Sequence, residues 1–169
     1  MRLHIGGESV KEGWKILNIQ QKRGVDFIGS ISDLSQFEDA SITEVYASHV
    51  FEHVMQRDAL PTLKGIHRVL KPAGMLYISV PDLDVLCNIF VDQNAPIDVK
   101  FNVMRMMFGG QIDDFDIHYM GWNQQFLFDY LQQAGFSEGR RVESFGIFSD
   151  TSEFKPYGAS ISLNVMATK

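Results

Sequence analysis

The chain has 169 residues, enough for one domain that buries about 70% of the surface its unfolded form exposes. A formal net charge of -6 argues against non-specific binding to nucleic acid. A single cysteine, Cys87, excludes an internal disulfide framework, and no apolar run approaches the roughly 18 residues of a membrane span. Residues 1–10 lack the apolar core of a secretion signal. We therefore expect one domain over residues 1–169, in the cytoplasm, with neither a nucleic-acid nor a membrane partner.

Short apolar runs between turn formers fill the first half of the chain and are typical of strands. The predicted strands are residues 3–5, 14–19, 25–29, 42–48 and 75–80. A helix between the last two is predicted from one apolar face: Leu60, Leu63, Ile66, His67 and Leu70. Pro72 and Gly74 are expected to end this helix. Strand, helix and strand in this order form a parallel crossover unit.

The second half of the chain predicts more helix. Residues 84–91 and 98–108 have helical patterns, and the polar loop 109–121 follows them. A further helix is predicted between Asn123, as its N-cap, and Gly135. Its apolar face is Phe126, Leu127, Tyr130, Leu131 and Ala134. Two final strands, 140–148 and 160–168, are expected to pair antiparallel because only a loop joins them.

These elements predict an α/β fold: a mostly parallel sheet with an antiparallel C-terminal hairpin and helices on its faces. Only residues 8–13 separate the first two strands. A parallel crossover through a helix needs a dozen residues or more, so the first helix is expected to be reduced or missing. We interpret residues 84–125 as a lid or insert over a substrate.

The stretch YASHVFEHV contains His49, Glu52 and His53, which spell the H-x-x-E-H pattern of some zinc peptidases. Those enzymes carry both histidines on one helix, one turn apart. Here the pattern follows a β-branched run, so His49 is expected at a junction of strand and loop. Zinc ligation, a structural role and a place in a cofactor pocket all remain open for these histidines, and the favoured reading has no metal.

Ligands of open α/β sheets bind beyond the carboxyl ends of the strands, so the residues after each strand are candidates for a site. Gly6 and Gly7 would let backbone approach a ligand, or would simply form a tight turn. Asn18 could bind a ribose hydroxyl, or be a polar residue that ends a strand. Asp33 and Leu34 could flank a flat base, or cap a turn.

Several of these stretches, taken together, resemble one known family. YASHVFEHV, followed after a helix by HRVLKPAGMLYISVPDLD, is similar to class I S-adenosylmethionine-dependent methyltransferases of the type 11-like branch. LHIGGE, GWKILNI and SISDLSQF resemble the first three strand motifs of the same branch. The resemblance implies a Rossmann-like three-layer sandwich that binds S-adenosylmethionine across the carboxyl ends of the first, second and fourth strands.

Carried over residue by residue, the resemblance implies a role for each candidate. The amino-acid part of the cofactor would lie against Gly6 and Gly7, and Asn18 would take the place of the ribose ligand. Adenine would meet Asp33 and Leu34. The floor beneath the sulfonium would be Ser48, His49 and Val50.

Three departures from the family pattern bear on cofactor binding. Glu8 stands where the family has the last glycine of its motif, and its carboxylate would repel the cofactor's carboxylate if no cation lay between them. Asn18 replaces an acidic ribose ligand and loses the charge-assisted strength of a carboxylate. The missing first helix leaves one side of the cofactor less enclosed, and a second subunit covering this gap, in a homo-oligomer, is left open.

Methyl transfer is an in-line displacement, which depends mainly on alignment and exclusion of water. A hydroxyl acceptor would also need a base. The first candidate is His118, beside Asp114 and Asp116 in the lid loop, and the second is His53. A solvated loop histidine is the alternative reading of His118.

We therefore expect a methyltransferase that acts on a small-molecule or saccharide-type acceptor. The alternative is a methyltransferase-like domain that has lost cofactor binding and serves as an interaction or scaffold module.

Overall fold

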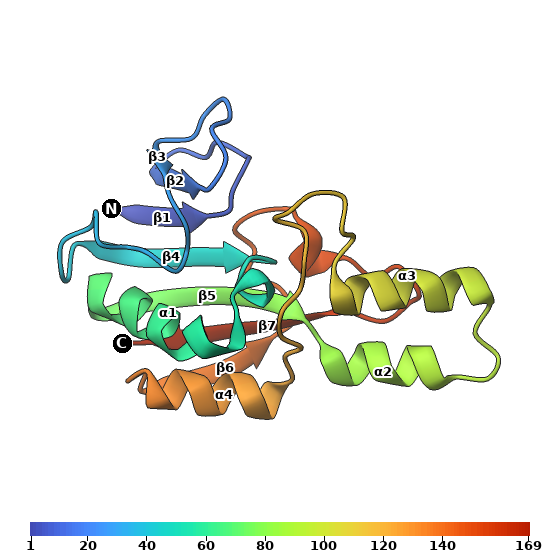
Figure 1. Cartoon of the computed structure of the whole chain (residues 1–169). Helices are drawn as coiled ribbons and strands as arrows, with labels where there is room; N and C mark the ends of the chain where they lie inside the picture. The colour runs from blue at the N-terminus through green and yellow to red at the C-terminus, as the bar shows by residue number, and fades with distance from the viewer.

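Seven strands form one sheet in the computed structural model, which describes residues 1–169 (Figure 1). The strand order is β3-β2-β1-β4-β5-β7-β6. In chain order the strands are β1 Arg2–Ile5, β2 Trp14–Asn18, β3 Phe27–Ile28, β4 Ile42–Ser48, β5 Leu70–Pro81, β6 Glu138–Val142 and β7 Ser162–Thr168. Strands β1 to β5 pair in parallel, and β7 is antiparallel to both β5 and β6. The predicted sheet and its antiparallel hairpin are confirmed.

Two helices lie on one face of the sheet, and two more lie past the end of its strand β5. They are α1 Gln56–Val69, α2 Leu83–Val91, α3 Ile97–Phe108 and α4 Gln124–Gln133, with single 3-10 turns η1 Phe51–His53 and η2 Thr151–Glu153. Figure 1 shows α1 and α4 packed along the sheet, whereas α2 and α3 form a pair that projects past the end of β5. The segment between β1 and β2 contains no helix, as the sequence predicted. None of the helices combines the length and the apolar character that crossing a membrane requires.

The main core lies between the sheet and the helices α1 and α4. Alternate strand residues such as Leu3, Val45 and Leu76 are fully buried there, against Leu63 and Ile66 of α1. Each fully buried leucine, isoleucine or valine contributes roughly 1.5–3 kcal/mol to folding. This core fixes β4 and β5 side by side and so fixes where β4 ends.

The opposite face of the sheet is covered by the long loop 143–161 and not by a helix. Phe148 of this loop packs on His4 and Tyr46, with ring centroids 4.1 and 4.8 Å apart. The Tyr46 hydroxyl donates a hydrogen bond of 2.8 Å to Asp150, and burial raises the pKa of Tyr46. Aromatic packing and one buried hydrogen bond therefore replace a helix in the third layer.

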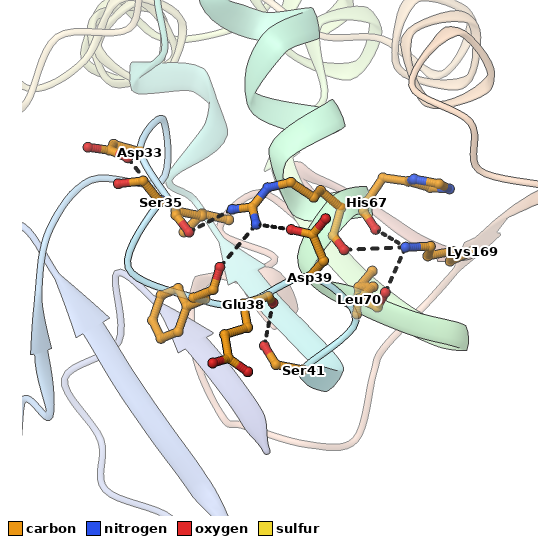
Figure 2. Close-up of polar contacts among 11 residues, drawn as sticks. Asp33, Ser35, Glu38, Asp39, Ser41, His67, Leu70 and Lys169 are labelled. Atoms are coloured by element: carbon orange, nitrogen blue, oxygen red, sulfur yellow. Dashed lines mark hydrogen bonds and ion pairs between the residues drawn. The ribbon is translucent and has the colours of Figure 1, made fainter.

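Several element boundaries differ from the prediction, and two of the differences have a clear structural cause. Helix α1 ends at Val69, ahead of the predicted stop at Pro72, because the chain passes directly into β5 at Leu70. The ammonium of Lys169 binds the carbonyl oxygens of His67 at 2.7 Å and Leu70 at 2.8 Å, which caps this helix end (Figure 2).

The predicted strand 140–148 ends at Val142, because the following residues turn back over the sheet to bring Phe148 onto its aromatic cluster. In α4, Leu127 and Leu131 are buried as expected and Asn123 is the N-cap, accepting a hydrogen bond of 2.9 Å from Phe126 N–H. The ring of Phe126 is 49% exposed, so its place on the buried face was wrong.

The segment 29–41 reaches β4 without a helix and is held by side-chain contacts instead. Arg68 of α1 donates to the carbonyl oxygens of Leu34 at 2.8 Å and Phe37 at 3.0 Å. Within the segment, Asp33 accepts from Ser35 N–H, a contact shown in Figure 2. These contacts hold the segment against α1, and residues 29–32 of the segment form one wall of the cavity described next.

Candidate functional site

A cavity of about 460 Å³ opens at the carboxyl ends of β1, β2 and β4. Small-molecule sites in proteins usually measure about 300–1,000 Å³ and occur at this edge of α/β sheets. Its walls include the predicted site residues Gly6, Glu8, Asn18, His49, Val50 and His53. A cavity of ligand size thus lies at the carboxyl ends of the strands, where the sequence placed the candidate site residues.

Gly6 forms the turn that ends β1. Its φ of +75° lies in the left-handed region, and its N–H donates to Leu17 O at 2.8 Å. A Cβ at this position would lie 2.3 Å from Cγ2 of Val50. Gly6 therefore lets the tip of β4 approach β1 closely. Gly7 does not line the cavity, and a Cβ there would collide with the ring of His4.

Asn18 lies at the end of β2 and is only 7% exposed. Its amide nitrogen donates to Gly7 O at 3.1 Å, and its amide oxygen accepts from Gln20 N–H at 2.9 Å. An aspartate could not make the first of these bonds, because a carboxylate has no donor. Asn18 thus clamps the β1 turn to β2, and one amide N–H remains free to meet a ligand.

Glu8 forms an ion pair with Lys22, and both residues line the cavity. The sequence predicted that Glu8 would repel a cofactor carboxylate if no cation lay nearby. Lys22 supplies that cation, so the local charge is balanced. Both side chains are largely exposed, which makes the pair itself worth little to stability.

Asp33 and Leu34, the predicted adenine contacts, do not line the cavity. Leu34 is buried in the main core, and the carboxylate of Asp33 closes a turn by accepting from Ser35 N–H at 3.0 Å. The preceding residues Ser30, Ile31 and Ser32 form the wall instead. The wall is therefore displaced by two to three residues, because the turn that Asp33 closes directs the chain back into the core.

The end of β4, which we call its tip, has an unusual backbone conformation. Ser48 ends the strand, and His49 has a φ of +52°, a conformation that non-glycine residues rarely adopt. The N–H of His49 donates to Ser79 O at 2.9 Å, and its Nε2 lies 2.8 Å from Ser162 Oγ. His49 and Val50 face the cavity, whereas the hydroxyl of Ser48 is buried and does not.

The two predicted bases lie next to each other behind this tip. The rings of His53 and His118 meet edge to face with centroids 4.8 Å apart. Nδ1 of His53 contacts Ile117 O at 3.1 Å, and Nδ1 of His118 contacts Met106 O at 2.9 Å. His53 lines the main cavity, whereas His118 lines a second one near α3.

The carboxylate beside these rings is Glu52, which the sequence did not single out as a partner of His118. Burial opposes its charge, yet the contact with His49 and the electrostatic interactions with His49, His53 and His118 hold the pKa of Glu52 below its ordinary value. Nδ1 of His49 lies 3.3 Å from Glu52 Oε1. Burial lowers the pKa of His118, and this outweighs the opposite effects of Glu52 and Asp116.

The loop 109–121 forms the outer wall of the cavity through Asp113, Asp114, Phe115, Asp116 and Tyr119. It is tied to η1 because Tyr119 N–H donates to Glu52 O at 2.9 Å. The helices α2 and α3 contribute no residue to this wall. Within the predicted lid 84–125, only this loop borders the cavity.

Sequence reasoning missed Lys22, the wall Ser30 to Ser32 and the partnership of Glu52 with His118. A signal for Lys22 existed, since a cation fourteen residues after an unexpected glutamate lies just beyond the next strand. No local signal links Glu52 to His118, because only the fold brings the lid loop against η1.

Comparisons with known proteins agree with this geometry. Residues 7–78 match a family model described as a methyltransferase domain. A comparison with curated proteins gives no match.

Solved structures share the fold of the whole chain. A SAM-dependent methyltransferase from Archaeoglobus fulgidus aligns with a TM-score of 0.61 at 16% identity, over 99% of this chain and 85% of that one. A possible histamine N-methyltransferase from Thermotoga maritima gives 0.58 at 19% identity, over 99% and 81%. The 1,6-didemethyltoxoflavin-N1-methyltransferase of Burkholderia thailandensis, solved with its substrate and S-adenosylhomocysteine, gives 0.60 at 15% identity, over 99% and 70%.

The resemblance read from the sequence is thereby confirmed. Residues 7–78 match the methyltransferase domain family, and the whole chain shares the fold of solved S-adenosylmethionine-dependent methyltransferases.

Proposed function

We propose that this protein binds S-adenosylmethionine in the cavity at the carboxyl ends of β1, β2 and β4 and transfers its methyl group to a small-molecule or saccharide-type acceptor. The observation that carries the proposal is the cavity itself, which has ligand size and lies where the family binds its cofactor. The cofactor would supply the methyl group.

The residues present fit this cofactor in charge and shape. Lys22 offers a positive charge to the carboxylate of the cofactor's amino-acid part, and Glu8 offers a negative charge to its ammonium. The remaining N–H of Asn18 suits a ribose hydroxyl, and Ile31 offers an apolar surface to a flat base. Gly6 keeps the floor open, because any side chain there would collide with Val50.

The chain's own contribution to transfer would be alignment and exclusion of water. The loop 109–121 covers the outer side of the cavity, where Tyr119 and Phe115 offer flat apolar surfaces to an acceptor. His53 is the better of the two candidate bases, because it lines this cavity and Ile117 O fixes its Nδ1, which leaves Nε2 free to take a proton. His118 would act behind it, as a positioning residue.

Two observations favour the alternative, a domain that has lost cofactor binding and acts as a scaffold. The side chain of Asn18 already uses one donor and its acceptor in hydrogen bonds to the backbone of Gly7 and Gln20. In addition, no helix between β1 and β2 closes the cavity. The cytoplasmic location and a homo-oligomer that covers this open side stay predictions.

The test is a calorimetric titration with S-adenosylhomocysteine. Replacing Ser32, at the exposed rim of the cavity, with Trp should weaken binding at least tenfold, because the ring would occupy the wall. Ser35→Trp, three residues on and outside the cavity, is the matched control and should bind as the wild type does. No binding by the wild type at millimolar ligand would favour the scaffold.

A further inference from the structure

Three potential metal ligands converge where η1 meets the loop 109–121. They are Glu52, His53 and His118, and one ligand atom from each lies within 4.8 Å of the other two. The sequence considered a metal only on His49 and His53, the histidines of the H-x-x-E-H pattern. In the fold His49 directs Nε2 to Ser162 at 2.8 Å and Nδ1 to Glu52 at 3.3 Å, and the histidine that joins Glu52 and His53 in the cluster is His118.

Glu52 is the observation that points to a cation. Its side chain is 1% exposed, and neither of its carboxylate oxygens accepts a hydrogen bond. The contact with His49 at 3.3 Å lacks the geometry of a hydrogen bond. A buried carboxylate without hydrogen bonds is costly unless it is paired or coordinates a metal.

The two histidines are held as metal ligands usually are. Each presents Nδ1 to a backbone carbonyl oxygen, Ile117 O for His53 and Met106 O for His118. A carbonyl oxygen can only accept, so in each neutral ring Nδ1 carries the proton and Nε2 carries the free lone pair. Metal-bound histidines almost always donate their other ring N–H in this way, which fixes the tautomer and the ring.

The backbone fixes the three residues relative to one another. Tyr119 N–H donates to Glu52 O at 2.9 Å, and His118 N–H donates to Phe108 O at 3.2 Å. The lid loop is therefore attached to η1 on one side and to the end of α3 on the other. A preformed arrangement of this kind reduces the ordering that metal binding would require.

We propose that Glu52, His53 and His118 form a binding site for one divalent transition metal ion of the zinc type, through a carboxylate oxygen and the Nε2 atoms of both histidines. Two histidines and one glutamate are a known ligand set for zinc, and three protein ligands leave a fourth position open. The bound ion would fasten the lid loop to the tip of β4.

A second consequence rests on the proposed methyltransferase function. The ion would occupy Nε2 of His53, so this nitrogen could no longer take a proton. An acceptor hydroxyl bound at the open position would instead release its proton to solvent more readily, because the metal lowers its pKa. His53 would then act on the acceptor through the metal.

The test uses the full chain without an affinity tag, stripped with a chelator and titrated with Zn²⁺ against a chromophoric competitor. The wild type should bind one equivalent. The variants Glu52→Gln, His53→Gln and His118→Gln should each lose more affinity than the roughly 10- to 100-fold that removal of an outer partner costs. His67→Gln, on α1 and outside the cluster, is the control and should keep full affinity.

Glu52→Gln separates binding from folding, because it removes a buried charge while it conserves shape. Its metal-free form should unfold cooperatively in urea, as the metal-free wild type does, and it should bind no Zn²⁺ at the site. Absence of Zn²⁺ binding by the wild type, or equal affinity in Glu52→Gln, would overturn the proposal. Titration of the same samples with S-adenosylhomocysteine separates the two proposals, since either ligand can bind while the other fails.

Discussion

The contact between Gly6 and Val50 makes a quantitative prediction about how the cavity floor is built. Replacing Gly6 with Ala puts an L-residue at a φ of +75°, which costs roughly 1–2 kcal/mol. The new methyl group would lie 2.3 Å from Val50 Cγ2, and overpacking of this kind costs about 1–3 kcal/mol more. The loss of chain entropy in the unfolded Ala variant returns only about 0.4–1 kcal/mol. We expect Gly6→Ala to lower the free energy of unfolding by about 2–4 kcal/mol.

The double variant Gly6→Ala with Val50→Ala isolates the steric part of this loss in stability. Val50→Ala alone removes two methyl groups from a half-buried side chain and should cost about 1 kcal/mol. In the double variant the nearest remaining atom is Val50 Cβ at 3.6 Å, an ordinary contact, so the clash disappears. The two substitutions should therefore be less damaging together than their sum, by about 1–3 kcal/mol.

Urea denaturation followed by circular dichroism measures all four corners of this cycle. Additivity within about 0.5 kcal/mol would refute the claim that these residues touch. An unchanged stability of Gly6→Ala would refute the left-handed turn as well.

Three further predictions follow from buried polar groups. Burial lowers the pKa of His4 to about 4, below its ordinary value of about 6.5, so the unfolded chain binds more protons than the folded chain between these pH values. The free energy of unfolding should therefore fall by roughly 3 kcal/mol as the pH drops from 6.5 to 4. His4→Phe should flatten this part of the pH profile measured by urea denaturation. Lys169→Met should lower the thermal midpoint by removing the ammonium that caps α1, at a cost of about 1–3 kcal/mol, whereas Lys64→Met on the exposed face of that helix should leave it unchanged. Asn18→Asp should lower the free energy of unfolding by about 1–3 kcal/mol at neutral pH, because the donor to Gly7 O is lost. The difference from wild type should shrink below about pH 4, where the acid is protonated and can donate. An equal difference at both pH values would contradict this hydrogen bond.

Sequence reasoning predicted the strands of the sheet well because strands follow from local patterns. The run Thr43 to Tyr46 has the β-branched and aromatic residues of a buried strand, so the position of His49 at its end could be read directly. The short connection of residues 8–13 likewise excluded a helix by length alone. The helix α1 could be predicted too, but its end could not, because Lys169 contacts it from the other end of the chain.

The site was harder to predict, since its walls depend on contacts between distant segments. Asp33 was expected beside a flat base from its position after a strand, yet its carboxylate closes a turn and the wall moves to Ser30 and Ser32. Glu8 was expected to hinder a cofactor, and Lys22 balances its charge. The position of Lys22 just beyond the next strand was a signal for this balance, but only the folded loops show that the two charges pair.

The pairing of Glu52 with His118 shows the same limit for chemistry. The H-x-x-E-H pattern suggested His49 as the partner of His53, because the spacing suits one helix. His49 instead follows β4 with a positive φ, as expected at the end of a strand, and its ring lies between Ser162 and Glu52. The lid loop then brings in His118, through backbone bonds that no sequence pattern encodes.

The central claim is that an adenosyl cofactor occupies the cavity at the carboxyl ends of β1, β2 and β4. Amide chemical shifts, followed by nuclear magnetic resonance as S-adenosylhomocysteine is added, test it most directly. We predict saturable shifts at Gly6, Ser32 and Val50, and none at Asn102 and Tyr157, which line the second cavity. Shifts confined to the second cavity, or none at saturating ligand, would contradict the account.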